Sequence, residues 1–186
     1  MPSILQSNLE VLSKRDPELA NRIAGLGPGL PPYLELIEAK SGLPAVRYHP
    51  PGDASARALC SVYDPVREAD RWAENEPVNS AINLVFLGVG LGYHIVSYLD
   101  RFGAHARSIA LVEFDPHLFR LALSMRDLRG LIGAEPCFCF VGEPSEVFPE
   151  LLKPLRTNFM VHNFKVLHHT PTQQINRQYY VDVAKE

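Results

Sequence analysis

The sequence predicts an α/β fold, a parallel sheet with helices on both faces. Three observations predict this class: apolar and amphipathic segments alternate from residue 81 onward, the first apolar segment is nearly continuous, and glycines follow it at once. A nearly continuous apolar strand is typical of a parallel sheet that is buried on both faces. Alternation of strands and helices predicts βαβ crossovers.

The composition of the 186-residue chain is that of a globular protein. Hydrophobic residues make up 46% and charged residues 21%, so the chain can bury a core. The formal net charge of -3 provides no general attraction for nucleic acid. No stretch has the roughly 18 to 20 apolar residues that span a bilayer, and the N-terminus lacks a signal-peptide pattern. We therefore expect a cytoplasmic protein without nucleic-acid or membrane partners.

Residues 1–80 predict a small helical and hairpin region in front of the sheet. Apolar residues at mostly helical spacing are interrupted by Asp16-Pro17, where Asp can cap and Pro can open a second helix. Candidate strands at 45–48 and 58–62 flank a Pro-Pro-Gly-Asp tip and predict a hairpin. The pair Asp64-Pro65 repeats this start before a polar helix expected at 66–75, and Asp115-Pro116 starts a further helix.

Residues 81–186 predict the Rossmann-like domain itself. We expect strands at 82–87, 108–112, 136–141 and 159–164, and helices at 93–102, 115–125, 145–152 and 172–185. A complete doubly wound sheet often has six or more strands. A domain of about four strands is therefore expected to be either compact or part of a longer protein.

The cysteines and histidines do not form a recognisable metal motif. Cys60, Cys137 and Cys139 lack CxxC spacing, and we interpret them as buried thiols. The histidines between residues 162 and 169 lack the i, i+4 arrangement of a zinc protease and a helper carboxylate. No metal site is predicted.

A glycine loop, Gly-Val-Gly-Leu-Gly at residues 88–92, lies between the first predicted strand and the following helix. Glycines let the backbone turn sharply and approach a ligand, and N–H groups at a helix start attract negative charge. An acidic residue, Glu113, ends the second strand. The candidate cofactor-binding residues are Gly88, Gly90, Gly92, Tyr93, His94 and Glu113.

The spacing of the glycines favours some nucleotide cofactors over others. Tyr93 stands where the dinucleotide fingerprint GxGxxG has its third glycine, which disfavours a nicotinamide cofactor. The GxGxG spacing resembles the first loop of S-adenosylmethionine-dependent methyltransferases, and this resemblance implies that Glu113 holds a ribose. Phe86 departs from that pattern, because many of those enzymes carry an acid there. Alternatively, the glycines only let the helix pack tightly on the strand.

Segments spread over residues 8 to about 180 resemble the N-terminal part of the motility accessory factor (Maf) proteins. In order they are NLE at 8–10, DPELA at 16–20, SGLP at 41–44, SVYDP at 61–65, FLGVGLGYH at 86–94, VE at 112–113 and RDL at 126–128. The resemblance implies a bacterial protein of flagellin or surface-glycan glycosylation, related to transferases of nonulosonic acids. In that family the transferase centre is thought to lie in a later domain with a Gly-Pro-Ser-Leu loop. This chain ends before any such motif, so no catalytic residue is expected here.

Three functions remain open from the sequence. The first is an auxiliary Rossmann-like domain, with or without a bound nucleotide or nucleotide-sugar, that positions the catalytic domain of the same protein or has a flagellin-related partner. The second is a small-molecule methyltransferase that uses S-adenosylmethionine. The third is an interaction module whose nucleotide-binding fold holds no ligand.

Overall fold

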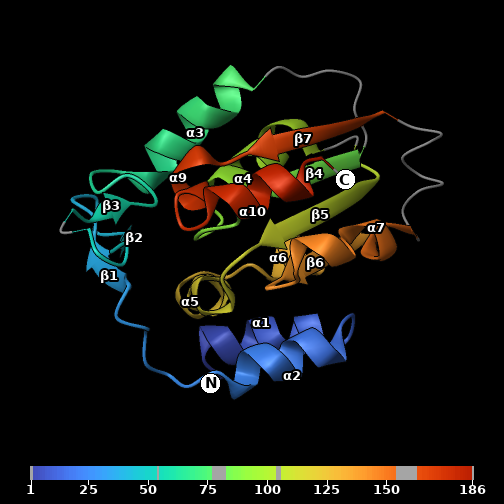
Figure 1. Cartoon of the computed structure of the whole chain (residues 1–186), viewed down its shortest axis with the longest axis horizontal. Helices are drawn as coiled ribbons and strands as arrows, with labels where there is room; N and C mark the ends of the chain where they lie inside the picture. The colour runs from blue at the N-terminus through green and yellow to red at the C-terminus, as the bar shows by residue number, and fades with distance from the viewer. Residues whose placement is uncertain (1, 54, 77–82, 104–105, 154–162, 186) are drawn as a thin grey trace.

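The computed structural model describes residues 2–53, 55–76, 83–103, 106–153 and 163–185, and its main feature is a parallel sheet of four strands. The strands have the order β6-β5-β4-β7 (Figure 1). The chain passes from β4 outward to β6 and then returns to the other side of β4, which makes a topological switch point between β4 and β7. The strands are β4 (Asn83–Leu87), β5 (Ser108–Glu113), β6 (Cys137–Val141) and β7 (Phe164–His168).

Helices pack on both faces of this sheet. One face carries Phe86 and Leu111 and is covered by α4 (Tyr93–Phe102), α5 (Pro116–Met125) and α6 (Arg129–Ile132). The other face carries Leu87 and Val112 and is covered by α7 (Phe148–Leu151) and α10 (Arg177–Val183). A 3₁₀ turn, η2 (Ser145–Val147), contacts both of these helices. The predicted fold class, a Rossmann-like parallel sheet with helices on both faces, is therefore confirmed.

The N-terminal elements form a second, smaller sheet and three helices. In the small sheet, β1 pairs with β2 and β2 with β3, all antiparallel. Helices α1 and α2 lie against α5 and α6, while α3 lies along α4 (Figure 1). The elements are α1 (Ile4–Ser13), α2 (Pro17–Gly25), β1 (Leu34–Glu38), β2 (Pro44–Tyr48), β3 (Arg57–Ala58) and α3 (Pro65–Asn75).

Three helices begin at an Asp-Pro pair, as the sequence predicts. The side chains of Asp16, Asp64 and Asp115 each accept a hydrogen bond from a backbone N–H in the first turn of α2, α3 and α5. Each proline follows at the first helical position, where its missing N–H costs no hydrogen bond. No helix among the described residues is both long and apolar enough to cross a bilayer.

Some predicted boundaries differ from the observed ones. The second hairpin strand is only Arg57–Ala58, and the last strand of the parallel sheet begins at Phe164, while the predicted residues 159–162 lie outside the described part of the chain. The predicted tail helix is divided into α9 (Thr170–Gln173) and α10. It is divided because Pro171 opens the first helix and Asn176 caps the second by accepting a hydrogen bond from the N–H of Tyr179.

Candidate functional site

The glycine loop lies at the carboxyl edge of the sheet, at the switch point. Because β4 and β7 are paired, the loop that leaves β4 is next to the segment that leaves β7. In open α/β sheets, ligands bind in the crevice at this point. Gly88, Gly90 and Gly92 have backbone φ angles of 93°, 53° and 76°, in a region that residues other than glycine rarely adopt. The backbone turn predicted for a nucleotide-binding loop is therefore present.

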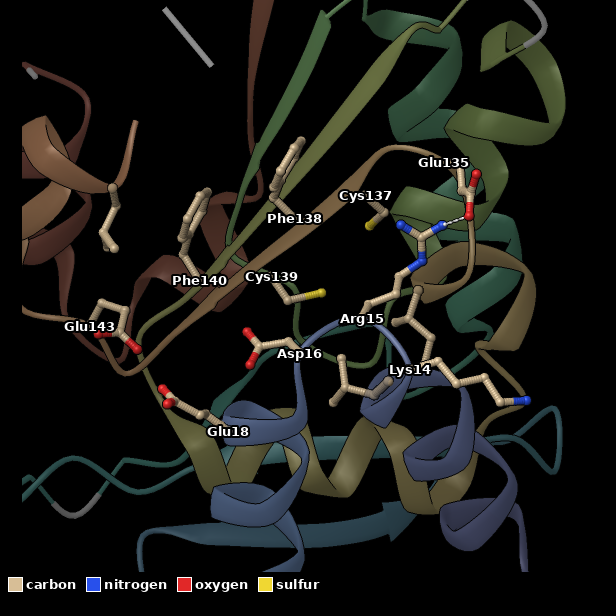
Figure 2. A pocket seen from close by; sticks show the side chains of 13 residues that line it. Lys14, Arg15, Asp16, Glu18, Glu135, Cys137, Phe138, Cys139, Phe140 and Glu143 are labelled. Atoms are coloured by element: carbon tan, nitrogen blue, oxygen red, sulfur yellow. Dashed lines mark ion pairs between the residues drawn. The ribbon is translucent and has the colours of Figure 1, made fainter. Parts of the chain in front are cut away.

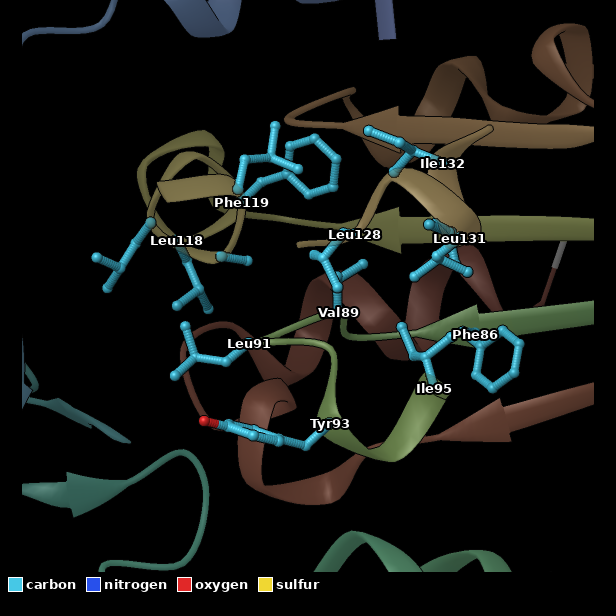
Figure 3. Packing of buried hydrophobic residues seen from close by; sticks show 14 of the residues in the cluster. Phe86, Val89, Leu91, Tyr93, Ile95, Leu118, Phe119, Leu128, Leu131 and Ile132 are labelled. Atoms are coloured by element: carbon cyan, nitrogen blue, oxygen red, sulfur yellow. The ribbon is translucent and has the colours of Figure 1, made fainter. Parts of the chain in front are cut away.

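The two residues between the glycines belong to the hydrophobic core. Val89 and Leu91 are 1% and 4% exposed, and both side chains point into the cluster beneath the loop (Figure 3). Around them in the same cluster are Phe86 and Ile95 of the flanking strand and helix. The packing of these two apolar side chains in the core therefore holds the loop in place.

Glu113 is fully buried and binds the glycine loop directly. One carboxylate oxygen, Oε2, accepts hydrogen bonds from the N–H groups of Val89 at 2.8 Å and Gly90 at 3.0 Å. The other, Oε1, accepts from the N–H of Asp115 at 3.1 Å and from the hydroxyl of Tyr180 at 2.9 Å. Four protein donors therefore occupy the carboxylate that the methyltransferase resemblance assigns to a ribose.

The crevice beside the loop contains α9. Thr172 is fully buried, and a Cβ atom placed on Gly90 would lie 2.6 Å from its Oγ1; one placed on Gly88 would lie 3.1 Å from its Cβ. The side-chain amide of Gln173 donates to the carbonyl of Leu87 at 2.9 Å. Glycine is therefore required at these two positions for two reasons: their positive φ, and the close approach of the protein's own helix.

His94 and His169 form a buried stack beside the loop. Their ring centroids are 3.7 Å apart with an angle of 4° between the planes, and Trp72 meets His94 edge-on at 5.1 Å. Nε2 of His94 lies 3.0 Å from the carbonyl of Gly88, so this nitrogen is the donor. Nδ1 of His169 lies 2.6 Å from Oγ1 of Thr172, which links the stack to α9.

Both rings of this stack are neutral at physiological pH. Burial lowers the pKa of His169 to about 3, and burial together with the neighbouring His169 lowers the pKa of His94 well below its ordinary 6.5. The described residues contain no group of three or more His, Cys, Asp or Glu side chains that could hold a metal ion. As neutral rings, the two histidines pack against each other and connect the loop to α9 through Gly88 and Thr172.

Tyr93 points away from the crevice toward the small sheet. Its hydroxyl donates to the carbonyl of Pro44 at 3.0 Å, and the guanidinium of Arg126 lies over its ring, 3.9 Å from the centroid. Arg126 also donates to the carbonyl of Leu91 at 3.3 Å. Tyr93 thus joins the N-terminal region to the glycine loop.

Beside the loop is a cavity of about 110 Å³, which is lined by aromatic and histidine side chains together with a thiol and a carboxyl. Small-molecule sites usually measure about 300 to 1,000 Å³. A nucleotide does not fit this volume, whereas a few water molecules do. Its lining includes Cys60, Glu68, Trp72, Tyr93, His94 and His169.

Five of the six predicted site residues lie in the glycine turn or contact it: Gly88, Gly90, Gly92, His94 and Glu113. The side chain of Tyr93 instead reaches β2, where its hydroxyl donates to the carbonyl of Pro44. The partners that complete the arrangement are Thr172, Tyr180 and Arg126, which sequence reasoning did not assign to the site. No spacing rule could identify them, because each is more than 30 residues away from the loop in sequence.

The ionisation of Glu113 should make stability depend on pH. Burial raises its pKa from 4.5 to about 7, although its four hydrogen bonds oppose the shift. Between about pH 4.5 and 7 the folded state binds more protons than the unfolded state, so Glu113 makes the free energy of unfolding fall as pH rises through that window. Its contribution is fully present below pH 4.5 and lost above about pH 7.

We expect this effect in a comparison of the parent with Glu113→Gln, by urea unfolding at pH 4.5 to 8. His94 and His169 contribute with the opposite sign below pH 6.5, because their pKa values are lowered, but they are present in both proteins and cancel. Stability of the parent relative to the variant should decline up to about pH 7 and then stay constant. A difference that does not change with pH would show that Glu113 has the same pKa in both states.

Comparison with known proteins supports the fold. No family model matches the chain. A protein of Treponema pallidum (strain Nichols), described only as uncharacterized, is 30% identical over 130 residues, which are 68% of this chain and 42% of that protein. The solved structure of a Maf glycosyltransferase from Magnetospirillum magneticum AMB-1 matches 97% of this chain and 34% of its own, with a TM-score of 0.62 and 15% identity.

The two matches show the fold of the chain but not its activity. The structural likeness shows that the chain has a fold like that of part of a Maf glycosyltransferase, and at 15% identity it shows the fold alone. The chain spans less than half the length of either protein. The Maf resemblance read from the sequence is therefore supported at the level of the fold.

Proposed function

We propose that this chain is an auxiliary Rossmann-like domain of a flagellin or surface-glycan glycosyltransferase-like protein, and that it positions a transferase centre located elsewhere. The observation that carries the auxiliary role is the contact of Thr172 with Gly88 and Gly90, because the protein's own helix occupies the crevice where a cofactor would bind. The Maf-like fold supports the glycosylation setting.

The chemistry of the site supports a role without turnover. Glu113 is saturated by four protein donors and has no contact with solvent. His94 and His169 are buried and neutral and are held by Gly88 and Thr172. A general base must reach the proton that it abstracts. Glu113 has no exposed surface, and the cavity that His94 and His169 line is smaller than the usual small-molecule site.

A second candidate is a nucleotide or nucleotide-sugar site that opens when α9 moves away. This candidate is favoured by Gly88, Gly90 and Gly92, which alternate with other residues and all have positive φ at the switch point. Glycine turns of this kind, before a helix N-terminus, are typical of nucleotide-binding loops. S-adenosylmethionine would require the same movement and also a new set of partners for Glu113, whose present donors include Tyr180 of α10.

A thermal-shift panel separates these candidates. The ligands are S-adenosylmethionine, its demethylated product, nucleoside diphosphates, and a nucleotide-activated nonulosonic acid. A ligand at one hundred times its dissociation constant stabilises by about 2.7 kcal/mol, which is roughly a 5 to 10 °C rise in Tm for a chain of this size. We expect no rise with any of them. A rise with a nucleotide or nucleotide-sugar would favour the second candidate.

The glycosylation setting needs its own experiment. Deletion of the gene should remove nonulosonic acid from flagellin or from the surface glycan, which intact-mass spectrometry of purified flagellin measures directly. The chain alone, mixed with flagellin and a nucleotide-activated nonulosonic acid, should transfer no sugar. Unchanged glycan mass in the deletion strain would contradict the proposed setting, whatever the outcome of the ligand panel.

We also propose that the predicted regions 1–80 and 81–186 fold as one unit in spite of their different architecture. Support comes from a single buried cluster that contains Leu12 and Ile23 of the N-terminal helices together with Leu111 and Phe119 of the sheet region. Buried polar contacts also join the two regions, as the hydrogen bond from Tyr93 to Pro44 illustrates.

A further inference from the structure

A polar groove runs along the outer edge of the parallel sheet. It has a volume of about 530 Å³ and lies between β6 and the turn that joins α1 to α2 (Figure 2). We call it the β6 groove; Arg15, Asp16, Glu18, Cys137, Cys139 and Glu143 are among its lining residues. It is on a different side of the fold from the glycine loop, and binding in this groove would be independent of the proposed function.

The groove exposes the backbone of an edge strand. Among the described strands, β6 has a neighbour only on the β5 side. The N–H of Ile109 donates to the carbonyl of Pro136, and the N–H of Gly142 donates to the carbonyl of Glu113, so the even-numbered residues of this segment face β5. In a parallel ladder the alternate residues face the other way. The N–H and C=O groups of Cys137 and Cys139 therefore point toward the groove.

Where β6 ends, one of its outward backbone groups already pairs with a basic side chain. The guanidinium of Arg22 donates to the outward carbonyl of Val141 at 2.6 Å and also to the carboxylate of Glu143 at 2.6 Å. A basic side chain thus pairs with a backbone acceptor and an acid at the end of the strand. The neighbouring backbone groups of Cys137 and Cys139 lie along the same edge.

The charged side chains of the groove indicate which charge a binding partner would carry. Four acidic and two basic side chains line it; Arg15 is paired with Glu135 at 2.8 Å, and Glu143 is paired with Arg22, so Asp16 and Glu18 are the acids left for an occupant. Glu18 is exposed, and Asp16 uses one carboxylate oxygen to cap α2. Figure 2 shows Asp16, Glu18 and Glu143 along one part of the groove beside Cys139. The groove therefore favours a positively charged segment.

We propose that the β6 groove binds an extended basic segment of a partner protein, which adds to the parallel sheet as a strand beside β6. Main-chain hydrogen bonds to Cys137 and Cys139 would supply affinity, and alternate Lys or Arg side chains would reach Asp16 and Glu18. A second copy of this chain is disfavoured, because symmetric pairing of β6 with β6 would bring two sets of the same carboxylates together.

The test uses the whole chain and a fluorescein-labelled peptide of sequence Lys-Val-Arg-Val-Lys-Val, with Glu-Val-Glu-Val-Glu-Val as its counterpart. We expect fluorescence polarisation to detect the basic peptide and not the acidic one. Glu18→Lys should weaken the basic peptide about fivefold, while Glu38→Lys, an exposed reversal on β1, should leave affinity unchanged. Two N-methylated forms of the basic peptide test strand addition. Methyl groups on the alternate nitrogens that face β6 should abolish binding, whereas methyl groups on the other alternate nitrogens should leave binding unchanged.

Amide hydrogen exchange then locates the contact. The N–H groups of Cys137 and Cys139 should exchange quickly in the free chain and become protected at saturating basic peptide. Absence of peptide binding, equal binding by Glu18→Lys, or unprotected amides at these two residues would each overturn the proposal. Protection that develops without peptide as protein concentration rises would assign the groove to a second copy and also overturn it.

Discussion

Replacement of Gly90 by Ala should destabilise the fold by about 3 kcal/mol, the sum of two penalties. The first is the backbone strain of a side chain at φ 53°, which costs about 1 to 2 kcal/mol. The second is overlap, because the new Cβ would lie 2.6 Å from Oγ1 of Thr172, and overpacking of a filled site costs about 1 to 3 kcal/mol. Thr172 cannot rotate away freely, since it is fully buried and bonded to His169.

A matched control and a double-mutant cycle separate the two penalties. Gly42 has φ 80° with no atom within 4 Å of a Cβ placed on it, so Gly42→Ala should cost only the strain. In a Thr172→Ala background the overlap is removed, because the remaining Cβ of residue 172 is 3.8 Å away. Gly90→Ala should then cost about as much as Gly42→Ala.

Urea unfolding of the four proteins in the cycle measures the coupling between residues 90 and 172. A coupling of about 1 to 2 kcal/mol is expected. If Gly90→Ala lowers the free energy of unfolding equally in both backgrounds, Thr172 of α9 does not contact the glycine loop in solution. The crevice would then be open, and the nucleotide-binding candidate would gain support.

Replacement of Asn8 by Ala should also cost about 3 kcal/mol. Asn8 is fully buried and joins α1 to the end of α5: its Nδ2 donates to the carbonyls of Leu123 at 2.8 Å and Arg126 at 2.7 Å. Its Oδ1 accepts from the N–H of Leu128 at 3.0 Å. The last carbonyls of a helix have no partner within the helix. Alanine would leave three backbone groups unpaired, each at about 1 kcal/mol or more.

The control for this prediction is Glu10→Ala on the exposed side of the same helix, where the ion pair with Lys14 contributes little. Both variants are compared with the parent by urea unfolding. A single transition for Asn8→Ala, displaced to lower urea, would support one folding unit for residues 1–80 and 81–186. Two separate transitions in the parent would contradict that proposal.

Local sequence patterns were enough for the elements that depend on neighbouring residues. The Asp-Pro pairs predicted the starts of α2, α3 and α5 because capping involves residues two or three positions apart. The apolar run and the glycines predicted β4 and the turn after it. The limits of the hairpin and of β7 were less well predicted, because strand ends depend on pairing with distant partners.

The amino-acid pattern around residues 88–92 is enough to predict a strand, a glycine loop and a helix, with an acid at the end of the next strand. The contacts of that loop arise only on folding: Glu113 binds its N–H groups, and Thr172 occupies the space beside Gly88 and Gly90. These partners are not predictable locally because they are distant along the chain. Thr172 follows the loop by about 80 residues and reaches it because β7 returns beside β4, a pairing that no local pattern encodes.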